Sequence, residues 1–302
     1  MIPMTATADP VIDRYPTRIS SEIVMMKRQE PTVWGSPEDG PISAGDLAGF
    51  GANGFLAVGE LLTPGEVGEC LAELRRLNDD PQVKADARTI GELAGDEVRT
   101  VFDIHKTDGP LGKLARDPRL AGRARQILGS DVYVHQSRIS YRPGFRGKGF
   151  YWHSDFEAWH AQDGMPAMRT VGISIALADE YPHNGSLMIM PGSHRTFVSC
   201  ADETQSGHDG EPLRMLEIRR PDTTSLATLC GESGITQVSG KAGSAVIFDS
   251  NCLHGSLDNI TPYPRSNVFI VFNSVENTLL EPFAGNSPRP DHIASRDFTP
   301  VA

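Results

Sequence analysis

Three side chains of this sequence form a pattern that could bind a metal ion. His153-Ser154-Asp155 is a His-x-Asp motif, and His254 follows far downstream. Two histidines and one carboxylate hold non-haem Fe(II) on one face and leave the opposite positions open for a co-substrate and dioxygen. The set therefore points to oxidative chemistry. His-x-Asp alone also occurs by chance, and a solvent-exposed turn is the alternative for the bare tripeptide.

Strand geometry explains how the motif could reach one ion. Side chains alternate between the two faces of a strand, so residues two apart project to the same side. His153 and Asp155 can therefore act from one strand, while His254 must come from elsewhere in the sheet. Ser256 shares a face with His254 by the same alternation, and its hydroxyl could donate to a carboxylate of the bound co-substrate.

The second half of the chain has the pattern of a sheet of short strands. Its segments are rich in β-branched and aromatic residues, and turn residues such as Pro143-Gly144 separate them. Many short strands without helices between them favour a mainly β fold with flanking helices and a double-stranded β-helix (jelly-roll, cupin-like) core over a βαβ fold. The expected strands are 131–142, 170–178, 186–191, 244–249 and 266–273.

Two amphipathic helices are expected before residue 130. Thr63-Pro64-Gly65-Glu66 combines a capping box with proline at the first helical position, and apolar residues at helical spacing follow, which predicts a helix over 64–78. Asp117-Pro118 begins a second helix by the same device, and Gly129 ends it.

Together these segments predict a single domain spanning the whole chain. The polar stretch 195–240 is expected to be an insertion or lid with a short helix near 223–230. The other expected parts are an extended arm over 1–45 within a helix-rich support over 1–130, a jelly-roll core over 131–275, and a C-terminal tail over 276–302.

Composition limits the partners. The net charge of −11 disfavours nucleic acid and anionic membranes, because both require basic patches. The N-terminus has no basic region followed by an apolar run, and no apolar stretch is long enough to span a membrane. The four cysteines are scattered without CxxC spacing, so we expect free thiols and a cytoplasmic protein. The sequence leaves the oligomeric state open, and a homodimer is one expectation.

Several blocks of the sequence resemble bacterial ectoine hydroxylases, a group within the phytanoyl-CoA-dioxygenase-like branch of Fe(II)/2-oxoglutarate oxygenases. The most specific block is FYWHSDFEAWHAQDGMP at 150–166. The others are DRYPTR at 13–18, DPRLAGRARQILGSDVYVHQSR at 117–138, PHNGSLMIMPGSH at 182–194, FDSNCLHGS at 248–256 and NITPYPRSNVF at 259–269.

The resemblance implies an enzyme that hydroxylates L-ectoine to 5-hydroxyectoine, a reaction of compatible-solute biosynthesis that protects against osmotic and heat stress. It implies Fe(II), 2-oxoglutarate and O2 as cofactor and co-substrates, with succinate and CO2 released. Carried over to this sequence, the family pattern makes His153, Asp155 and His254 the iron ligands. A carboxylate in the motif also disfavours a halogenase, because halide would need its position.

The resemblance also implies residues for 2-oxoglutarate. Arg265 lies eleven residues after His254, where the superfamily has the arginine that grips the distal carboxylate. A guanidinium offers a carboxylate a bidentate fork, although a lone Arg265 would also fit a surface arginine at a strand start. Arg142 stands where the family usually has a lysine, and Ser140 replaces a family asparagine.

The expected ectoine-binding residues are Gln136, Trp159 and Phe150. An aromatic face suits a delocalised cation such as the ring of ectoine, although a core tryptophan is the alternative for Trp159. Gln136 and Arg142 belong to an alternating polar face of 131–142, which could also face solvent. His135, His160 and His194 are not expected to be part of the site, and Cys252 is of interest only because it lies two residues before His254.

Two alternatives remain at the level of sequence. The same chemistry could act on another small zwitterion such as proline, and a jelly-roll protein could bind a solute or a metal without turnover. Residues 210–225 lack the tyrosine-containing stretch expected in the family, which leaves substrate preference open if that stretch belongs to the lid.

Overall fold

The computed structural model describes residues 12–91, 97–202, 218–285 and 287–302. Its largest element is an antiparallel sheet of seven strands. In order across the sheet, the strands are β2 (Phe55–Val58), β11 (Ala245–Asp249), β7 (Thr170–Ala176), β13 (Arg265–Ser274), β5 (Val132–Arg142), β4 (Val98–Phe102) and β3 (Thr89–Gly91).

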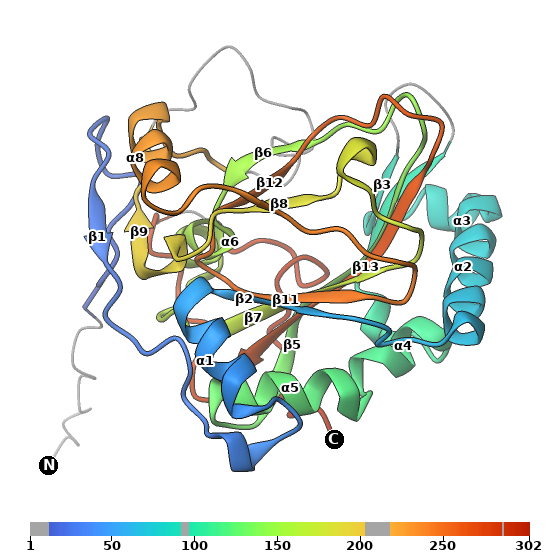
Figure 1. Cartoon of the computed structure of the whole chain (residues 1–302), viewed down its shortest axis with the longest axis horizontal. Coiled ribbons are helices and arrows are strands. Elements are labelled where there is room, and N and C mark those ends of the chain that lie inside the picture. Colours follow the sequence, from blue (N-terminus) through green and yellow to red (C-terminus); the bar gives the residue numbers. More distant parts are fainter. Residues whose placement is uncertain (1–11, 92–96, 203–217, 286) are drawn as a thin grey trace, which may run out of the picture.

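A second sheet of four strands faces the first, so the core is the expected jelly roll (Figure 1). A third sheet, of two strands, pairs residues 25–27 of the N-terminal arm with residues 196–198. The small sheet has the order β10 (Thr236–Gln237), β8 (Leu187–Ile189), β12 (His254–Ser256) and β6 (Phe150–His153), and the arm sheet consists of β1 (Met25–Lys27) and β9 (Thr196–Val198).

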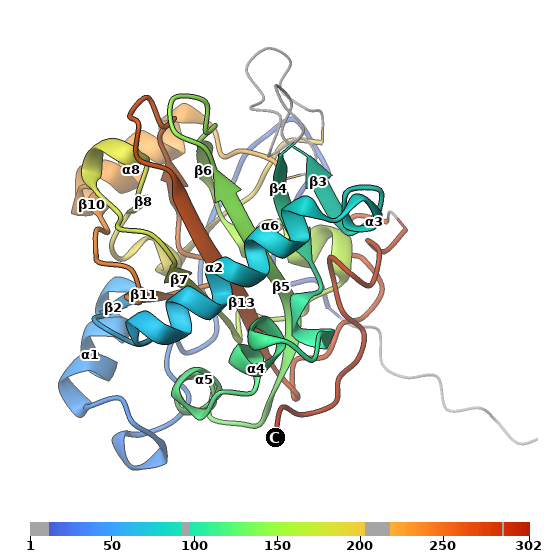
Figure 2. The same cartoon turned by 90° about the vertical axis from the view of Figure 1, so that its right-hand side faces the viewer.

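Helices cover the outer face of the large sheet (Figure 2). The longest, α2 (Pro64–Asp79), begins at Thr63 with the predicted capping box, and α5 (Pro118–Leu128) ends at Gly129, whose φ of 59° is left-handed. The other helices are η1 (Pro37–Asp39), α1 (Ala44–Asn53), α3 (Pro81–Lys84), η2 (Ile104–Lys106), α4 (Pro110–Ala115), α6 (Asp155–Ala158), the π-helical turn η3 (Trp159–Asp163), η4 (Pro182–Asn184), η5 (Ser193–Arg195) and α8 (Thr223–Ser233). No helix within the described residues is long and apolar enough to cross a membrane.

Alternation along β13 divides the core into two layers. Val268, Ile270 and Phe272 pack under the helices, while Phe269 and Val271 face the small sheet. The helix-side layer is continuous with the buried faces of α2 and α5. Both faces of the large sheet are therefore packed against apolar side chains, and the sheet forms one wall of the space between the two sheets.

The structure differs from the sequence predictions mainly before residue 130. Three strands of the large sheet, β2, β3 and β4, lie in the part expected to be helix-rich. They are short, and β4 is buried along its whole length, so it lacks the alternation that marks a half-buried strand. Helix α1 also begins within the expected arm. The division of the chain into support, core and tail stays a prediction.

Candidate functional site

His153, Asp155 and His254 lie together between the two sheets, and all three are buried. One ligand atom of each lies within 4.8 Å of the other two. Nε2 of His153 is 3.8 Å from Oδ1 of Asp155, and Nε2 of His254 is 3.8 Å from Oδ2 of the same carboxylate. The predicted convergence of these side chains is confirmed, while their role as ligands stays a prediction.

The local backbone differs from the expected strand. β6 ends at His153, and Asp155 is the first residue of the short helix α6. The intervening Ser154 has an extended backbone with φ −109° and ψ 131°, so Asp155 still lies on the side of His153. His254 is the first residue of β12 and pairs directly with His153 across the small sheet.

Hydrogen bonds fix both imidazole rings. Nδ1 of His153 donates to the Tyr151 carbonyl at 2.7 Å, and Nδ1 of His254 donates to the Cys252 carbonyl at 3.0 Å. Burial, reinforced by the nearby His254, lowers the pKa of His153 to about 3. A neutral ring that donates through Nδ1 keeps an Nε2 lone pair for a metal.

The donor set fits a divalent cation. Oδ2 of Asp155 is buried and has no hydrogen-bond partner among the described residues. A buried carboxylate oxygen without a partner is costly, and a metal ion held by the three side chains would satisfy it. Two imidazoles and one carboxylate match the facial set that leaves positions open.

A hollow beside the three residues has an empty volume of about 500 Å³, part of it open to solvent, and three arginines line it: Arg138, Arg142 and Arg265. Arg142 donates to the hydroxyl of Ser256 at 2.8 Å and stacks 4.7 Å above the ring of Phe150. Arg265 donates to Glu180 at 2.5 Å and to the Gly185 carbonyl at 2.9 Å.

Charge in this hollow is predominantly positive. Burial lowers the pKa of Arg142 well below its usual range, and the neighbouring Arg265 lowers it further. Glu180 balances one of these two guanidiniums, so a carboxylate ligand would balance the other. The site therefore combines a group of side chains suited to a metal ion with a pair of guanidiniums suited to an anion.

Comparison with known proteins identifies the family. The family model described as phytanoyl-CoA dioxygenase (PhyH) matches residues 50–267. The chain belongs to the phytanoyl-CoA dioxygenase family. Within this family it is 57% identical to the protein named ectoine dioxygenase from Streptomyces coelicolor, over 99% of this chain and 100% of that protein. It is 54% identical to the ectoine dioxygenase of Nocardia farcinica, with 100% of both chains covered.

A solved structure superposes on nearly the whole fold. The crystal structure of EctD from S. alaskensis with 2-oxoglutarate and 5-hydroxyectoine has a TM-score of 0.84 and 41% sequence identity. The match covers 94% of this chain and 95% of that chain. The jelly-roll family fold therefore extends over nearly the whole of this protein.

The structure brings six of the ten predicted site residues to the wall of the hollow. They are Arg142, Phe150, His153, His254, Ser256 and Arg265. Asp155 completes the metal-binding group but is not part of that wall. Ser140 lies 3.2 Å from the hydroxyl of Thr100 on β4 and does not line the hollow. Its assignment to 2-oxoglutarate stays a prediction.

Gln136 and Trp159 are the other two residues outside the hollow. The side-chain amide of Gln136 donates to the Ile293 carbonyl in the C-terminal tail at 2.7 Å. Trp159 is buried, with its ring centroid 5.1 Å from that of His135. His135 is skipped in the β5–β13 register, which marks a β-bulge. Their assignment to substrate stays a prediction.

Two further residues, one that lines the hollow and one that contacts its wall, are not predicted from the sequence. Arg138 lines it and stacks 4.2 Å above Phe269, and burial lowers the pKa of its guanidinium to about 10. Arg138 belongs to the same alternating polar face as Gln136 and Arg142, so the sequence pattern could have predicted its place in the site. Glu180, the partner of Arg265, lies in a loop without any pattern that would single it out.

The residues left out of the metal set are indeed held elsewhere. His160 is hydrogen-bonded to Asp13 at 2.9 Å and to the Met165 carbonyl at 2.8 Å. His194 bonds the Gly51 carbonyl at 3.2 Å, and Cys252 packs against Ser193. Of the segment 210–225, residues 210–217 lie outside the described residues.

Proposed function

We propose that this protein is an Fe(II)- and 2-oxoglutarate-dependent dioxygenase that hydroxylates L-ectoine to 5-hydroxyectoine and releases succinate and CO2. The observation that carries the proposal is its full-length similarity to a structure that holds 2-oxoglutarate and 5-hydroxyectoine. The buried His-Asp-His group beside an arginine-lined hollow supports the same chemistry independently.

His153, Asp155 and His254 would hold the Fe(II). When bound, the iron supplies the activation of dioxygen that an organic side chain cannot supply. The residues prepare for it by presenting neutral Nε2 atoms and a carboxylate with an unsatisfied oxygen. Burial of all three excludes bulk water from the reacting centre.

Arg142, Arg265 and Ser256 would bind the distal carboxylate of 2-oxoglutarate. The two guanidiniums reach the same hollow from adjacent strands, and the Ser256 hydroxyl already contacts Arg142. Glu180 and the Gly185 carbonyl hold Arg265 in one orientation, which reduces the ordering that binding requires. Ser140 is the fourth residue proposed for this co-substrate.

Trp159, Gln136 and Phe150 would bind ectoine. The ring of ectoine carries a delocalised positive charge, which an indole face attracts. The carbonyl of Ile293 holds the amide of Gln136 and would thereby orient it. Phe150 lines the hollow directly and would pack against the bound molecules.

The decisive experiment uses full-length protein purified without oxygen and loaded with Fe(II). After 2-oxoglutarate, ectoine and air are added, NMR should identify 5-hydroxyectoine, and succinate should form in equal amount. Turnover of proline in place of ectoine would retain the reaction class but change the substrate. Ligand-dependent stabilisation without oxygen consumption would replace the enzyme by a binding protein.

A cytoplasmic location and a homodimer are part of the proposal. Burial raises the pKa of the Cys70 thiol to about 11, which suits an unreactive reduced cysteine. Light scattering coupled to size exclusion measures the mass of the particle, which a dimer would double from 32.8 kDa.

A further inference from the structure

The strand pairing between the two segments that carry the candidate metal ligands runs from Phe150 and Ser256 to the two histidines and stops there. β6 ends at His153 and β12 begins at His254, and these two residues face each other in the register. Asp155 lies beyond the end of β6, on the first turn of α6. Strand pairing therefore places the two histidines but leaves the carboxylate to other contacts.

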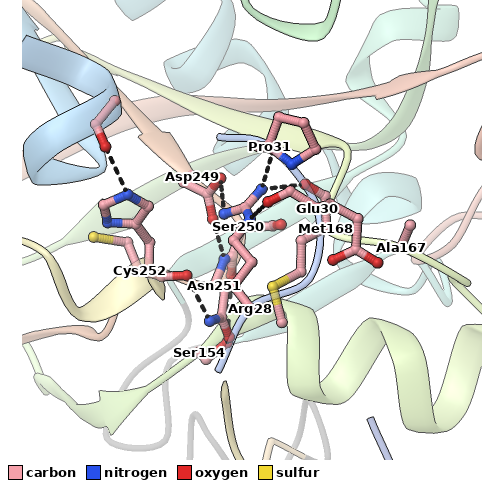
Figure 3. A network of polar contacts seen from close by, with 12 residues as sticks. Arg28, Glu30, Pro31, Ser154, Ala167, Met168, Asp249, Ser250, Asn251 and Cys252 are labelled. Atoms are coloured by element: carbon pink, nitrogen blue, oxygen red, sulfur yellow. Dashed lines mark hydrogen bonds and ion pairs between the residues drawn. The ribbon is translucent and has the colours of Figure 1, made fainter. Parts of the chain in front are cut away.

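Hydrogen bonds on both sides of Asp155 supply those contacts. The hydroxyl of Ser154 donates to Oδ1 of Asn251 at 3.1 Å. The backbone N–H of Phe156 donates to the Ser250 carbonyl at 2.9 Å. The residue before Asp155 is thus bonded to Asn251 and the residue after it to Ser250, and both partners lie shortly before His254 in the chain. Figure 3 shows the contact of Ser154.

The amide of Asn251 is fully used and can adopt only one orientation. Its Nδ2 donates to the carbonyls of His194 and Thr196 at 3.0 and 3.1 Å. With both N–H groups directed at carbonyls, Oδ1 must face Ser154. Only 1% of Asn251 is exposed, so water offers little substitute for these bonds.

An ion pair fixes the turn on which Asn251 lies. Asp249 accepts from the backbone N–H of Asn251 at 2.8 Å, and its other oxygen accepts from Arg28 at 2.6 Å. Arg28 also donates to the carbonyls of Glu30, Pro31 and Met168. Its guanidinium therefore joins the N-terminal arm to the turn that precedes His254 (Figure 3).

We propose that Asn251 is a positioning residue for the metal-ligand set: through Ser154 it places Asp155 relative to the two histidines, on a turn held by Arg28 and Asp249. The hydrogen bonds of Asn251 go to Ser154, Asp249 and the carbonyls of His194 and Thr196, so it acts on the metal-ligand set through Ser154. Residues that orient metal ligands typically change metal affinity by about 10- to 100-fold when they are altered. This inference rests on the metal site of the proposed function.

The test is metal binding by the variant Asn251→Asp. The substitution preserves shape but replaces two N–H donors by an oxygen that faces two carbonyls. Full-length protein is titrated with Mn²⁺ alone, and free Mn²⁺ is measured by electron paramagnetic resonance. We expect the Kd for Mn²⁺ to rise by about 10- to 100-fold.

Gln126→Glu is the matched control. Gln126 is another buried amide, on α5, and it binds the backbone N–H and carbonyl of Ile42 at 2.7 and 2.9 Å. This variant loses a similar set of bonds away from the metal group, so it should lose stability and retain the wild-type Kd for Mn²⁺. Thermal unfolding of both variants separates stability from affinity.

The outcomes distinguish this inference from the proposed function. A wild-type protein that binds no Mn²⁺ or Fe(II) would refute the metal site itself. Wild-type affinity in Asn251→Asp, despite lower stability, would overturn the positioning role. If Asn251→Asp does not fold, Ser154→Ala decides instead: it should weaken Mn²⁺ binding severalfold, whereas Ser225→Ala, which removes a buried hydroxyl from α8, should not.

Discussion

Arg142 and Arg265 occupy directly opposite positions on the adjacent antiparallel strands β5 and β13. Like charges opposite each other destabilise a sheet. Both guanidiniums nevertheless line the same hollow, and only one of them is bonded to a carboxylate among the described residues. A stability cost of this kind is expected where the pair serves an anionic ligand.

Arg265→Lys should therefore weaken 2-oxoglutarate binding specifically. Lysine keeps the charge but loses the planar fork that can bond Glu180, Gly185 and a carboxylate together. A hydrogen bond to a charged group contributes about 1.5–3 kcal/mol, so the KM for 2-oxoglutarate should rise about 10- to 100-fold. Steady-state kinetics with each substrate varied in turn would measure it.

Arg169→Lys is the control for that change. Arg169 is also buried and also bonds a backbone carbonyl, that of Leu128, but it stacks on Trp34 away from the hollow. Its KM for 2-oxoglutarate should equal that of the wild type. An equal rise in both variants would assign the effect to general loss of packing.

Asp155→Asn should abolish metal-dependent turnover. The amide retains the shape of the carboxylate but removes the charge and replaces one oxygen by a donor that faces Nε2 of a histidine. Affinity for Mn²⁺ should fall by more than about 100-fold, the upper end of the range for residues that only orient ligands. Anaerobic metal titration and succinate assays provide the two measurements.

Asp222→Asn offers the corresponding control because asparagine caps a helix as well as aspartate does. Retained coupled turnover in Asp155→Asn would contradict the assignment of Asp155 as a ligand. Loss of activity in both variants would point to a stability effect shared by the two substitutions.

Local signals in the sequence were enough to predict several elements and the metal group. Thr63 and Glu66 marked the start of α2, and alternation marked β5 almost to the residue. Two histidines and an aspartate were sufficient to predict a metal-binding group, because this combination of ligand types is specific even when the residues lie far apart in the chain.

The remaining features depend on contacts between distant residues. Glu180 acquires its role only when the fold brings it to Arg265, and Asn251 only when its turn meets Ser154. The bulge at His135 likewise changes the alternation of β5 at one residue, which no periodic pattern announces. Short, fully buried strands such as β4 cannot be predicted from alternation either, because burial on both faces removes the alternating pattern.

Trp159→Leu should impair ectoine binding more than 2-oxoglutarate binding. A cation over an indole ring contributes about 0.5–2 kcal/mol, which predicts a rise of about 2- to 30-fold in the KM for ectoine. Trp34→Leu removes an indole that stacks on Arg169 instead, and should leave that KM unchanged. An unaltered KM for ectoine in Trp159→Leu would assign Trp159 to the core alone.

Asp163 forms a buried ion pair with Arg289 of the C-terminal tail, and Asp163→Asn should destabilise the fold. Arg289 donates to both oxygens of Asp163 at 2.7 and 2.6 Å, and Nε2 of His135 lies 3.2 Å from one of them. Removing one partner of a buried ion pair costs about 3–5 kcal/mol. Denaturant unfolding near neutral pH should show a loss of this size.

The pH dependence of that loss tests its electrostatic origin. Burial alone would raise the pKa of Asp163, but Arg289 and then His135 hold it down, from its ordinary value of 3.8 to about 2. A depressed folded-state pKa contributes stability above the unfolded value, and this contribution disappears as the pH falls through the folded value. The difference in unfolding free energy between wild type and Asp163→Asn should therefore be constant above pH 3.8 and shrink as the pH falls towards 2. A difference that stays the same across this interval would show that the lost packing, not the charge of Asp163, accounts for the destabilisation.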